Sequence, residues 1–319
     1  MAVAEAKEPM NRVIFGDCRD TMRDLKAQGV RVQCCVTSPP YYGLRDYGHP
    51  GQIGLEKTPA EYVAALVEVF ECARDLLADD GVLWLNLGDS YAGYHGNKNS
   101  ELPTSSTNGW TNGYNENKRG SARPQDIGLK PKDLIGIPWR VAFALQAAGW
   151  YLRQDIIWHK PNPMPESVRD RCTKAHEYIF LLTKGPRYFF DAAAMREPGV
   201  YPAGTKGAKG SASRMGVKNV NARPPEYKVY DGFRNRRSVW TVATRPYKGA
   251  HFATFPPALI EPCILAGSRP GDIVLDPFMG SGTTAEVAQA LGRQWVGCEL
   301  NPEYAPLQQA RMAQAALAI

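Results

Sequence analysis

Short apolar runs alternate with longer amphipathic segments over the first ninety residues. The short runs predict β-strands at 12–15, 32–36 and 82–87. The amphipathic segments predict two helices, at 19–28 and from Thr58-Pro59 to Asp80-Gly81. In the second helix, Thr58 offers a hydroxyl N-cap and Pro59 suits the first turn. Its apolar residues follow at helical spacing, at Tyr62, Leu66, Val69, Phe70 and Leu76. Strands and helices that alternate with short links predict a parallel sheet.

The same alternation continues through the rest of the chain, with two interruptions. We expect helices at 132–147, 257–266 and 283–291 and from Pro302 onward, and strands at 151–158, 177–183, 273–275 and 295–298. The pattern as a whole predicts an α/β fold with a mainly parallel sheet. Residues 91–128 interrupt it with Asn, Gly, Ser and Thr and few aliphatic residues, which predicts a long mobile loop.

The second interruption, at 196–245, has an irregular pattern and is strongly basic. Its eleven basic residues are Arg196, Lys206, Lys209, Arg214, Lys218, Arg223, Lys228, Arg234, Arg236, Arg237 and Arg245, against the acids Glu197, Glu226 and Asp231. Its aromatic residues are Tyr201, Tyr227, Tyr230, Phe233 and Trp240. Cations that neutralise phosphates, mixed with rings and guanidinium groups that can meet bases, are typical of a nucleic-acid surface. We assign DNA contacts to Arg234, Arg236 and Arg237; a solvated loop is the plainer alternative.

Composition restricts the class of protein. The 319 residues are 44% hydrophobic and 22% charged, which suffices for one large domain with an insertion or for two domains. The net charge of +6 is weak evidence for a polyanionic partner. The seven cysteines include no CxxC pair, which predicts reduced thiols and neither a zinc site nor disulfides. Because no apolar run approaches bilayer length and no signal segment is recognisable, we expect a cytoplasmic protein. We also expect no metal.

A glycine-rich turn follows the strand predicted at 273–275, in the segment Asp276-Pro277-Phe278-Met279-Gly280-Ser281-Gly282. Glycines let the backbone approach a ligand and expose N–H groups at the start of a helix. Glu299 follows the next strand, where dinucleotide folds place an acid that binds ribose. The turn also fits a dinucleotide fingerprint, so a nicotinamide-dependent oxidoreductase is an alternative. Too few residues follow it for the remaining strands of such a fold, and Asp276 suits an ammonium-bearing ligand better than a pyrophosphate.

A second segment, Thr37-Ser38-Pro39-Pro40-Tyr41, ends the strand predicted at 32–36. The two prolines fix the backbone and remove two N–H donors, which leaves a rigid set of acceptors where α/β folds place their chemistry. An exocyclic amine could give one hydrogen to Ser38 Oγ and one to the Pro39 carbonyl, with Tyr41 stacked on the ring. A plain proline turn is the alternative.

Together, the two segments resemble motifs IV and I of the amino-directed DNA methyltransferases, the N4-cytosine and N6-adenine enzymes. Motif IV precedes motif I with a variable region between, as in the permuted β class. Other segments resemble further motifs of the family: Gly16-Asp17 (III), Asn86–Asp89 (VI), Ile157–Pro161 (VII), His176–Phe180 (VIII) and His251–Pro256 (X). The resemblance implies a Rossmann-like methyltransferase fold, with a mainly parallel seven-stranded sheet and helices on both faces.

The resemblance also implies roles for individual residues. S-adenosyl-L-methionine would be held by Asp17, Thr37, Phe255, Asp276, Pro277, Phe278, Gly280, Ser281, Gly282, Thr283, Glu299 and Asn301. Within this set, Glu299 would bind the ribose and Asp17 the adenine. The base flipped out of duplex DNA would be held by Ser38, Pro39, Pro40 and Tyr41, with His176 and Trp158 as weaker candidates.

The domain organisation follows from the same comparison. Residues 11–190 would form the catalytic half, 191–250 the target-recognition region and 251–319 the cofactor-binding half. The β class often forms dimers, so the resemblance is compatible with a homodimer. We expect the amine to lose its proton to water after or during methyl transfer.

The target base and the reaction class each have alternatives. The family uses Ser-Pro-Pro-Tyr mostly for cytosine N4, so Ser38 favours cytosine, with adenine N6 as the alternative. Cytosine C5 methylation needs a thiolate nucleophile, and Pro262-Cys263 reads better as a buried helical thiol. A noncatalytic DNA-binding protein would explain the basic stretch but neither pocket segment.

Overall fold

The computed structural model describes residues 10–92, 128–208, 227–244 and 255–316. Two compact units form the chain. The larger contains the residues up to Phe190 together with those from Ser238, and the smaller is Asp191–Arg237. Within the described residues, no helix is long and apolar enough to cross a membrane. Most of the predicted loop at 91–128, and part of the basic stretch, lie outside the described residues.

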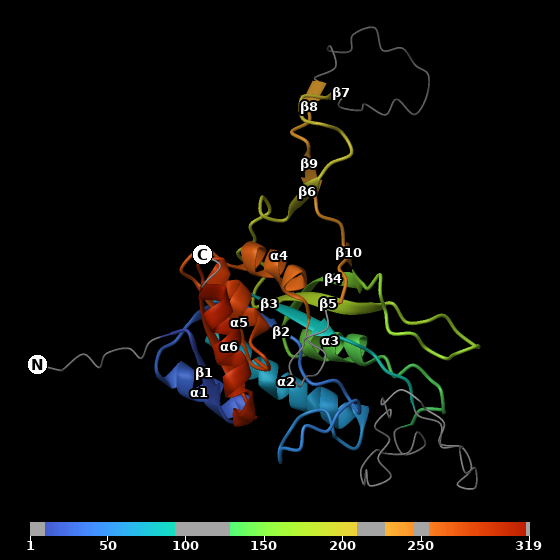
Figure 1. The fold of residues 1–319 in the computed structure, drawn as a ribbon, viewed down its shortest axis with the longest axis vertical. Coiled ribbons are helices and arrows are strands. Elements are labelled where there is room, and N and C mark those ends of the chain that lie inside the picture. The colour runs from blue at the N-terminus through green and yellow to red at the C-terminus, as the bar shows by residue number, and fades with distance from the viewer. Residues whose placement is uncertain (1–9, 93–127, 209–226, 245–254, 317–319) are drawn as a thin grey trace, which may run out of the picture. The chain divides into compact units, whose positions relative to one another are not determined.

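A mostly parallel sheet is the centre of the larger unit (Figure 1). Its strands lie in the order β1 (Arg12–Phe15), β12 (Gln294–Glu299), β11 (Ile273–Asp276), β2 (Val32–Thr37), β3 (Leu77–Leu87), β5 (His176–Thr183), β4 (Tyr151–His159) and β10 (Val239–Thr241). All neighbours are parallel except β5, which runs antiparallel to both β3 and β4. The predicted α/β class is confirmed. The described sheet has eight strands where seven were expected, because β10 pairs with β4 at the edge.

Helices cover both faces of this sheet (Figure 1). One face carries α1 (Cys18–Ala27), α2 (Pro59–Leu76) and α3 (Ile137–Ala147), and the other carries α4 (Pro257–Gly267), α5 (Thr283–Ala290) and α6 (Ala305–Ala316), which follows a 3-10 turn at Pro302–Tyr304. Alternate residues of β3 serve the two faces, as its pleat requires. Leu83 and Leu85 belong to the core under α1–α3, whereas Val82 and Trp84 lie against Gly267 of α4.

The end of α2 was predicted wrongly. Asp80-Gly81 does not terminate the helix, since α2 ends at Leu76 and β3 begins at Leu77. Leu77 pairs with Val32, and the register shifts before Val82 pairs with Cys34. This bulge accommodates the extra residues of β3 between the two pairings. Glycine suits position 81, because a Cβ there would lie 2.9 Å from Leu77 Cδ2, which is too close for a side chain.

The start of α3 was also predicted wrongly, at Lys132 instead of Ile137. Lys132 has a φ of 72°, and Gly136, the N-cap, has a φ of 79°, both outside the helical region. Asp89 supplies the missing cap from another segment, because its carboxylate accepts from the Gly136 and Ile137 N–H groups at 3.0 Å.

The smaller unit consists of short antiparallel strands instead of the irregular chain that was predicted. Its two ladders are β6 (Arg196–Pro198) with β9 (Phe233–Asn235), and β7 (Lys206–Ala208) with β8 (Tyr227–Val229). Strands of three residues separated by glycine and proline carry too little alternation to be recognised from sequence. The unit ends at Arg237, and β10 belongs to the large sheet, so the boundary expected at 250 differs from the observed one.

Candidate active site

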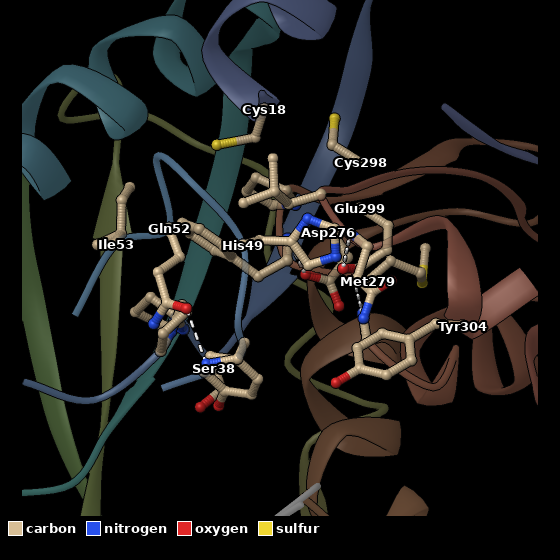
Figure 2. Close-up of a pocket in the computed structure, with 18 of the residues that line it drawn as sticks. Cys18, Ser38, His49, Gln52, Ile53, Asp276, Met279, Cys298, Glu299 and Tyr304 are labelled. Carbon is tan, nitrogen blue, oxygen red and sulfur yellow. Dashed lines mark hydrogen bonds between the residues drawn. The ribbon is translucent and has the colours of Figure 1, made fainter. Parts of the chain in front are cut away.

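Parallel strands that end at one edge of the sheet bring distant segments of the chain together. At this edge β2 ends at Thr37, β11 at Asp276 and β12 at Glu299, while Gly16-Asp17 follows β1. A cavity lies here, between the N-terminal half and the C-terminal half of the larger unit (Figure 2). Of the predicted residues, it is lined by Asp17, Ser38, Pro39, Pro40, Tyr41, Phe255, Asp276, Pro277, Phe278, Gly280, Ser281, Thr283, Glu299 and Asn301.

Two predicted residues support this cavity without lining it, Thr37 and Gly282. Thr37 is fully buried, and its hydroxyl donates to Asp276 Oδ1 at 2.6 Å. Gly282 has a φ of 88° as the N-cap of α5, and a Cβ there would lie 3.7 Å from Gln308 of α6. Both residues therefore act on the site indirectly, by positioning residues that line the cavity.

Asp276 is a buried carboxylate whose oxygens are occupied by the protein itself. Besides Thr37, it accepts from Thr284 Oγ1 at 2.6 Å and from the Phe278 N–H at 3.0 Å. Burial raises its pKa, and these donors oppose that rise. Asp276 thus fastens the glycine turn to β2 and α5, and its negative charge lies beside the cavity.

The glycine turn presents groups that suit a polar ligand. Gly280 has a φ of 52°, a left-handed conformation that favours glycine. No side chain caps the start of α5 at Gly282. Ser281 Oγ is buried and has no hydrogen-bond partner among the described atoms. Because a buried hydroxyl without a partner is costly, this atom at the cavity wall indicates a ligand position.

Glu299 connects the glycine turn to the segment that follows β12. Its two carboxylate oxygens accept from the Gly280 N–H at 2.7 Å and from the Asn301 N–H at 2.9 Å. Burial raises its pKa, while these backbone donors lower it. Each oxygen retains a lone pair, so Glu299 can accept further bonds from a diol.

Asp17, which follows β1 and also lines the cavity, is the N-cap of α1. Its side chain accepts from the Arg19 N–H at 2.8 Å and forms an ion pair with the Arg19 guanidinium at 2.6 Å. The hydrogen bond from the Arg19 side chain lowers the pKa of Asp17. This acid is therefore fixed and charged at the cavity wall.

The proline segment forms the opposite side of the cavity. Ser38 is partly exposed there, and Pro39 is buried. The Pro40 carbonyl accepts from Tyr62 Oη of α2 at 2.8 Å, which anchors the segment to the core. The Pro39 carbonyl has no donor within the described part of the chain, so it and Ser38 Oγ are acceptors beside the cavity.

Tyr41 is held more firmly than the sequence suggested. Its hydroxyl donates to Glu177 Oε2 at 2.7 Å and lies 3.3 Å from Asn86 Oδ1. Its ring rests against Gly88, where a Cβ would lie 2.5 Å from Tyr41 Cε2. Burial, together with the neighbouring Glu177 charge, raises the pKa of Tyr41, so it remains a neutral phenol.

The sequence reasoning did not identify the polar group around Tyr41 as a site. Asn86 of β3 donates to Glu177 Oε2 at 3.2 Å, and Lys160 forms a largely buried ion pair with Glu177. These residues lie inside the segments that resemble motifs VI, VII and VIII. A signal was present, since a charged residue within an apolar strand is seldom buried without a partner.

A loop after the proline segment supplies another wall that was not predicted. The Gly43 N–H donates to the Gly54 carbonyl at 2.7 Å, which closes the loop. Gln52 holds its interior by accepting from the Tyr47 N–H at 2.7 Å. His49 and Gln52 line the cavity, and Figure 2 shows Gln52 on the side of Ser38 and Tyr304 on the side of Glu299.

The two weaker candidates for the base pocket, Trp158 and His176, do not line the cavity. Trp158 is buried and donates to the Val242 carbonyl at 2.8 Å, and His176 packs edge-on against Tyr178. Cys263 is buried in α4, as predicted for a thiol that is not a nucleophile. Of the segment that resembles motif X, residues 251–254 lie outside the described residues, while Phe255 lines the cavity.

The cavity fits S-adenosyl-L-methionine. Fixed carboxylates at Asp17, Asp276 and Glu299 surround it, which suits a ligand that carries a sulfonium and an ammonium group and disfavours a pyrophosphate. The uncapped helix start and the unpartnered Ser281 hydroxyl offer further polar contacts. Fold and cavity together define an S-adenosylmethionine-dependent methyltransferase.

Comparisons with known proteins narrow the class. The N6/N4 methyltransferase family, described as DNA methylase, matches residues 32–310. The type II methyltransferase M.Cfr9I of Citrobacter freundii is 49% identical over 290 residues, covering 91% of this chain and 83% of that protein. M.SmaI of Serratia marcescens, also a type II methyltransferase, is 48% identical over 304 residues, covering 94% and 90%.

Solved structures share the fold. The PvuII DNA methyltransferase (cytosine-N4-specific) superposes with a TM-score of 0.59 at 18% identity, covering 96% of this chain and 87% of that one. The M1.HpyAVI-SAM complex gives 0.54 at 19% identity, covering 94% and 98%. The chain belongs to the N6/N4 DNA methylase family. It is a DNA amino-methyltransferase that uses S-adenosyl-L-methionine and acts on duplex DNA.

Proposed function

We propose that this protein methylates the exocyclic N4 of a cytosine flipped out of duplex DNA. The proposal rests on Ser38, which lines the cavity together with Pro39. The family uses serine at this position mostly for cytosine N4. The PvuII methyltransferase, which shares the fold, is named cytosine-N4-specific, and this name supports the proposal. Adenine N6 is the second candidate, since a hydroxyl can accept from either amine.

The proline segment has the task of holding the target amine. Ser38 Oγ and the Pro39 carbonyl accept one amine hydrogen each, which draws electron density toward the nitrogen. Tyr62 keeps the segment rigid through the Pro40 carbonyl. Bound S-adenosyl-L-methionine supplies an electrophilic methyl group. Because Tyr41 is anchored by its hydroxyl and by Gly88, its ring is a fixed surface for a flipped base.

The opposite side of the cavity has the task of holding the cofactor. We assign the ribose hydroxyls to Glu299, the adenine to the side of Asp17, and a polar contact to Ser281 Oγ. Thr37 and Gly282 act indirectly, by fixing Asp276 and the start of α5. The other contacts are assigned to Phe255, Pro277, Phe278, Gly280, Thr283 and Asn301, all at the cavity.

Base analysis tests the proposal. DNA from a host that lacks amino methylation would be incubated with the purified protein and S-adenosyl-L-methionine and digested to nucleosides. The modified nucleoside would be identified by its mass and by its chromatographic retention against N4-methyl and C5-methyl standards, because these two methylated cytosines have the same mass. We expect N4-methylcytosine. N6-methyladenine would establish the second candidate, and unmodified DNA would contradict both.

We assign target recognition to the smaller unit, Asp191–Arg237. Arg236 and Arg237 are exposed at its end. Arg234, predicted with them, forms an ion pair with Glu197 at 2.8 Å, and Arg196 forms one with Asp231 at 2.6 Å. Part of the basic charge is therefore neutralised within the unit, so we expect Arg234 to contribute less to phosphate binding.

The salt dependence of DNA binding tests this assignment. Replacing both Arg236 and Arg237 by alanine should reduce the slope of log affinity against log salt by roughly 1 to 2, at about 0.9 for each lost phosphate contact. Fluorescence anisotropy with labelled duplex DNA measures the slope. The control pair, Arg23→Ala and Lys26→Ala, removes exposed cations of α1 that pair with Asp20 and Asp75. An equal slope in both double variants would place the DNA contacts elsewhere.

A further inference from the structure

A chain of polar side chains leads from the proline segment toward β5. Ser38 Oγ lies 3.4 Å from Tyr41 Oη, and Tyr41 Oη lies 2.7 Å from Glu177 Oε2. The Glu177 side chain is 14% exposed, and its other oxygen pairs with Lys160. The chain thus begins at the residue that meets the target amine in the proposed function and ends at a carboxylate, which can take up a proton.

Glu177 sets the direction of these hydrogen bonds. A carboxylate only accepts, so Tyr41 gives its single proton to Glu177 and leaves its oxygen lone pairs for Ser38. Asn86 does not compete well, because its Oδ1 is farther from Tyr41 and neutral. Its Nδ2 instead donates to the same Glu177 oxygen. Both hydroxyl protons therefore point toward Glu177, and Ser38 Oγ can present a lone pair to the cavity.

Methyl transfer to an amine requires a proton acceptor. As the new N–C bond forms and the methyl–sulfur bond breaks, the amine nitrogen becomes positively charged and must lose one proton. The Pro39 carbonyl can accept a hydrogen bond but has no proton to pass on. Ser38 can take a proton from the amine while giving its own to Tyr41, which gives its own to Glu177.

We propose that Glu177 is the proton acceptor of the methyl-transfer reaction, reached from the target amine through Ser38 and Tyr41. The inference rests on the proposed function, because it takes Ser38 as the residue that meets the amine. Both hydroxyls end neutral, and the proton resides on Glu177 until it is released to solvent between turnovers. Water is then the final acceptor, and Glu177 precedes it.

Lys160 is a positioning residue in this arrangement. Its ammonium pairs with Glu177 and lies 4.2 Å from the centre of the Trp158 ring. The Trp158 ring and the Glu177 carboxylate together fix the Lys160 ammonium. The ammonium in turn holds Glu177 beside Tyr41. The contact between Ser38 and Tyr41 is the longest of the chain, so binding of the base has to shorten it before a proton can cross.

Single-turnover methylation by Glu177 variants tests the relay. Glu177→Gln preserves size and a hydrogen-bond acceptor but takes up no proton, whereas Glu177→Asp preserves a carboxylate. We expect Glu177→Gln to slow transfer about 100-fold, in the range of general base catalysis, and Glu177→Asp to recover at least about tenfold of that loss. Glu166→Gln is the matched control, because Glu166 forms an ion pair with Arg171 outside the site.

Binding readouts separate proton transfer from structure. Affinity for S-adenosyl-L-methionine, affinity for DNA and base flipping, followed with a fluorescent base analogue, should match the wild type in Glu177→Gln. A wild-type rate in Glu177→Gln, a parallel loss of affinity or flipping, or an aspartate variant as slow as the glutamine variant would each overturn the relay. If the wild type itself methylates no amino group, the proposed function fails first, independently of Glu177.

Discussion

Replacing Ser38 by alanine should lower the single-turnover rate of DNA methylation about 100-fold, the typical cost of removing one group that acts on the reacting centre. The hydroxyl accepts an amine hydrogen in the proposed function, and its loss leaves the Pro39 carbonyl as the remaining acceptor. Its side chain lies across the cavity from Glu299, so affinity for S-adenosyl-L-methionine should change little. Rapid-quench kinetics and equilibrium binding measure the two quantities separately.

Ser281→Ala is the matched comparison, since it removes one hydroxyl from the other side of the same cavity. There the affinity for S-adenosyl-L-methionine should fall, by about tenfold for one lost hydrogen bond. If Ser38→Ala loses cofactor affinity and rate in equal measure, the assignment of Ser38 to the amine is wrong.

Replacing Glu299 by glutamine should weaken S-adenosyl-L-methionine binding by about 10- to 100-fold, since hydrogen bonds to a charged group contribute about 1.5–3 kcal/mol. The carboxylate has to hold the Gly280 and Asn301 N–H groups and accept from the ribose at the same time. A neutral amide has one acceptor oxygen for these tasks. Isothermal calorimetry gives the dissociation constant.

Glu303→Gln is the control, because Glu303 is an exposed acid four residues further on. Burial raises the pKa of Glu299, so this carboxylate is protonated at a higher pH than an ordinary glutamate. On acidification, the wild type should therefore begin to lose cofactor affinity at that higher pH. That loss should persist in Glu303→Gln and disappear in Glu299→Gln. Unchanged affinity in Glu299→Gln would remove Glu299 from the ribose site.

The elements that carry the cofactor site were largely predictable from sequence. The strand that ends at Asp276, the glycine turn and the following helix have a periodicity that local residues determine. The α/β class followed from the same pattern. The local pattern could not predict contacts between segments that are distant in the sequence. Asp89 replaces a cap that α3 itself lacks, and a bulge in β2–β3 lets α2 end earlier than Asp80-Gly81 suggested.

The site shows the same division between local and long-range information. The positions of Ser38 and Glu299 at the cavity could be predicted, because each lies in a compact motif at a strand end. Glu177 could be noticed as a charged residue in an apolar strand, but its partners could not be predicted, because they depend on the antiparallel pairing that places β5 beside β3. The basic stretch was recognised by its charge, yet the ion pair of Arg234 with Glu197 depends on the pairing of β6 with β9.

Transfer of a methyl group to the amino nitrogen of cytosine, as we propose, can be tested directly. Uniformly ¹⁵N-labelled DNA, methylated by the protein with S-adenosyl-L-methionine that carries a ¹³C methyl group, would be digested to nucleosides and examined by NMR. We predict a methylated cytosine nucleoside whose ¹³C methyl signal shows a one-bond coupling to ¹⁵N. A methylated cytosine nucleoside without that coupling, or the coupled methyl signal on adenine, would contradict it.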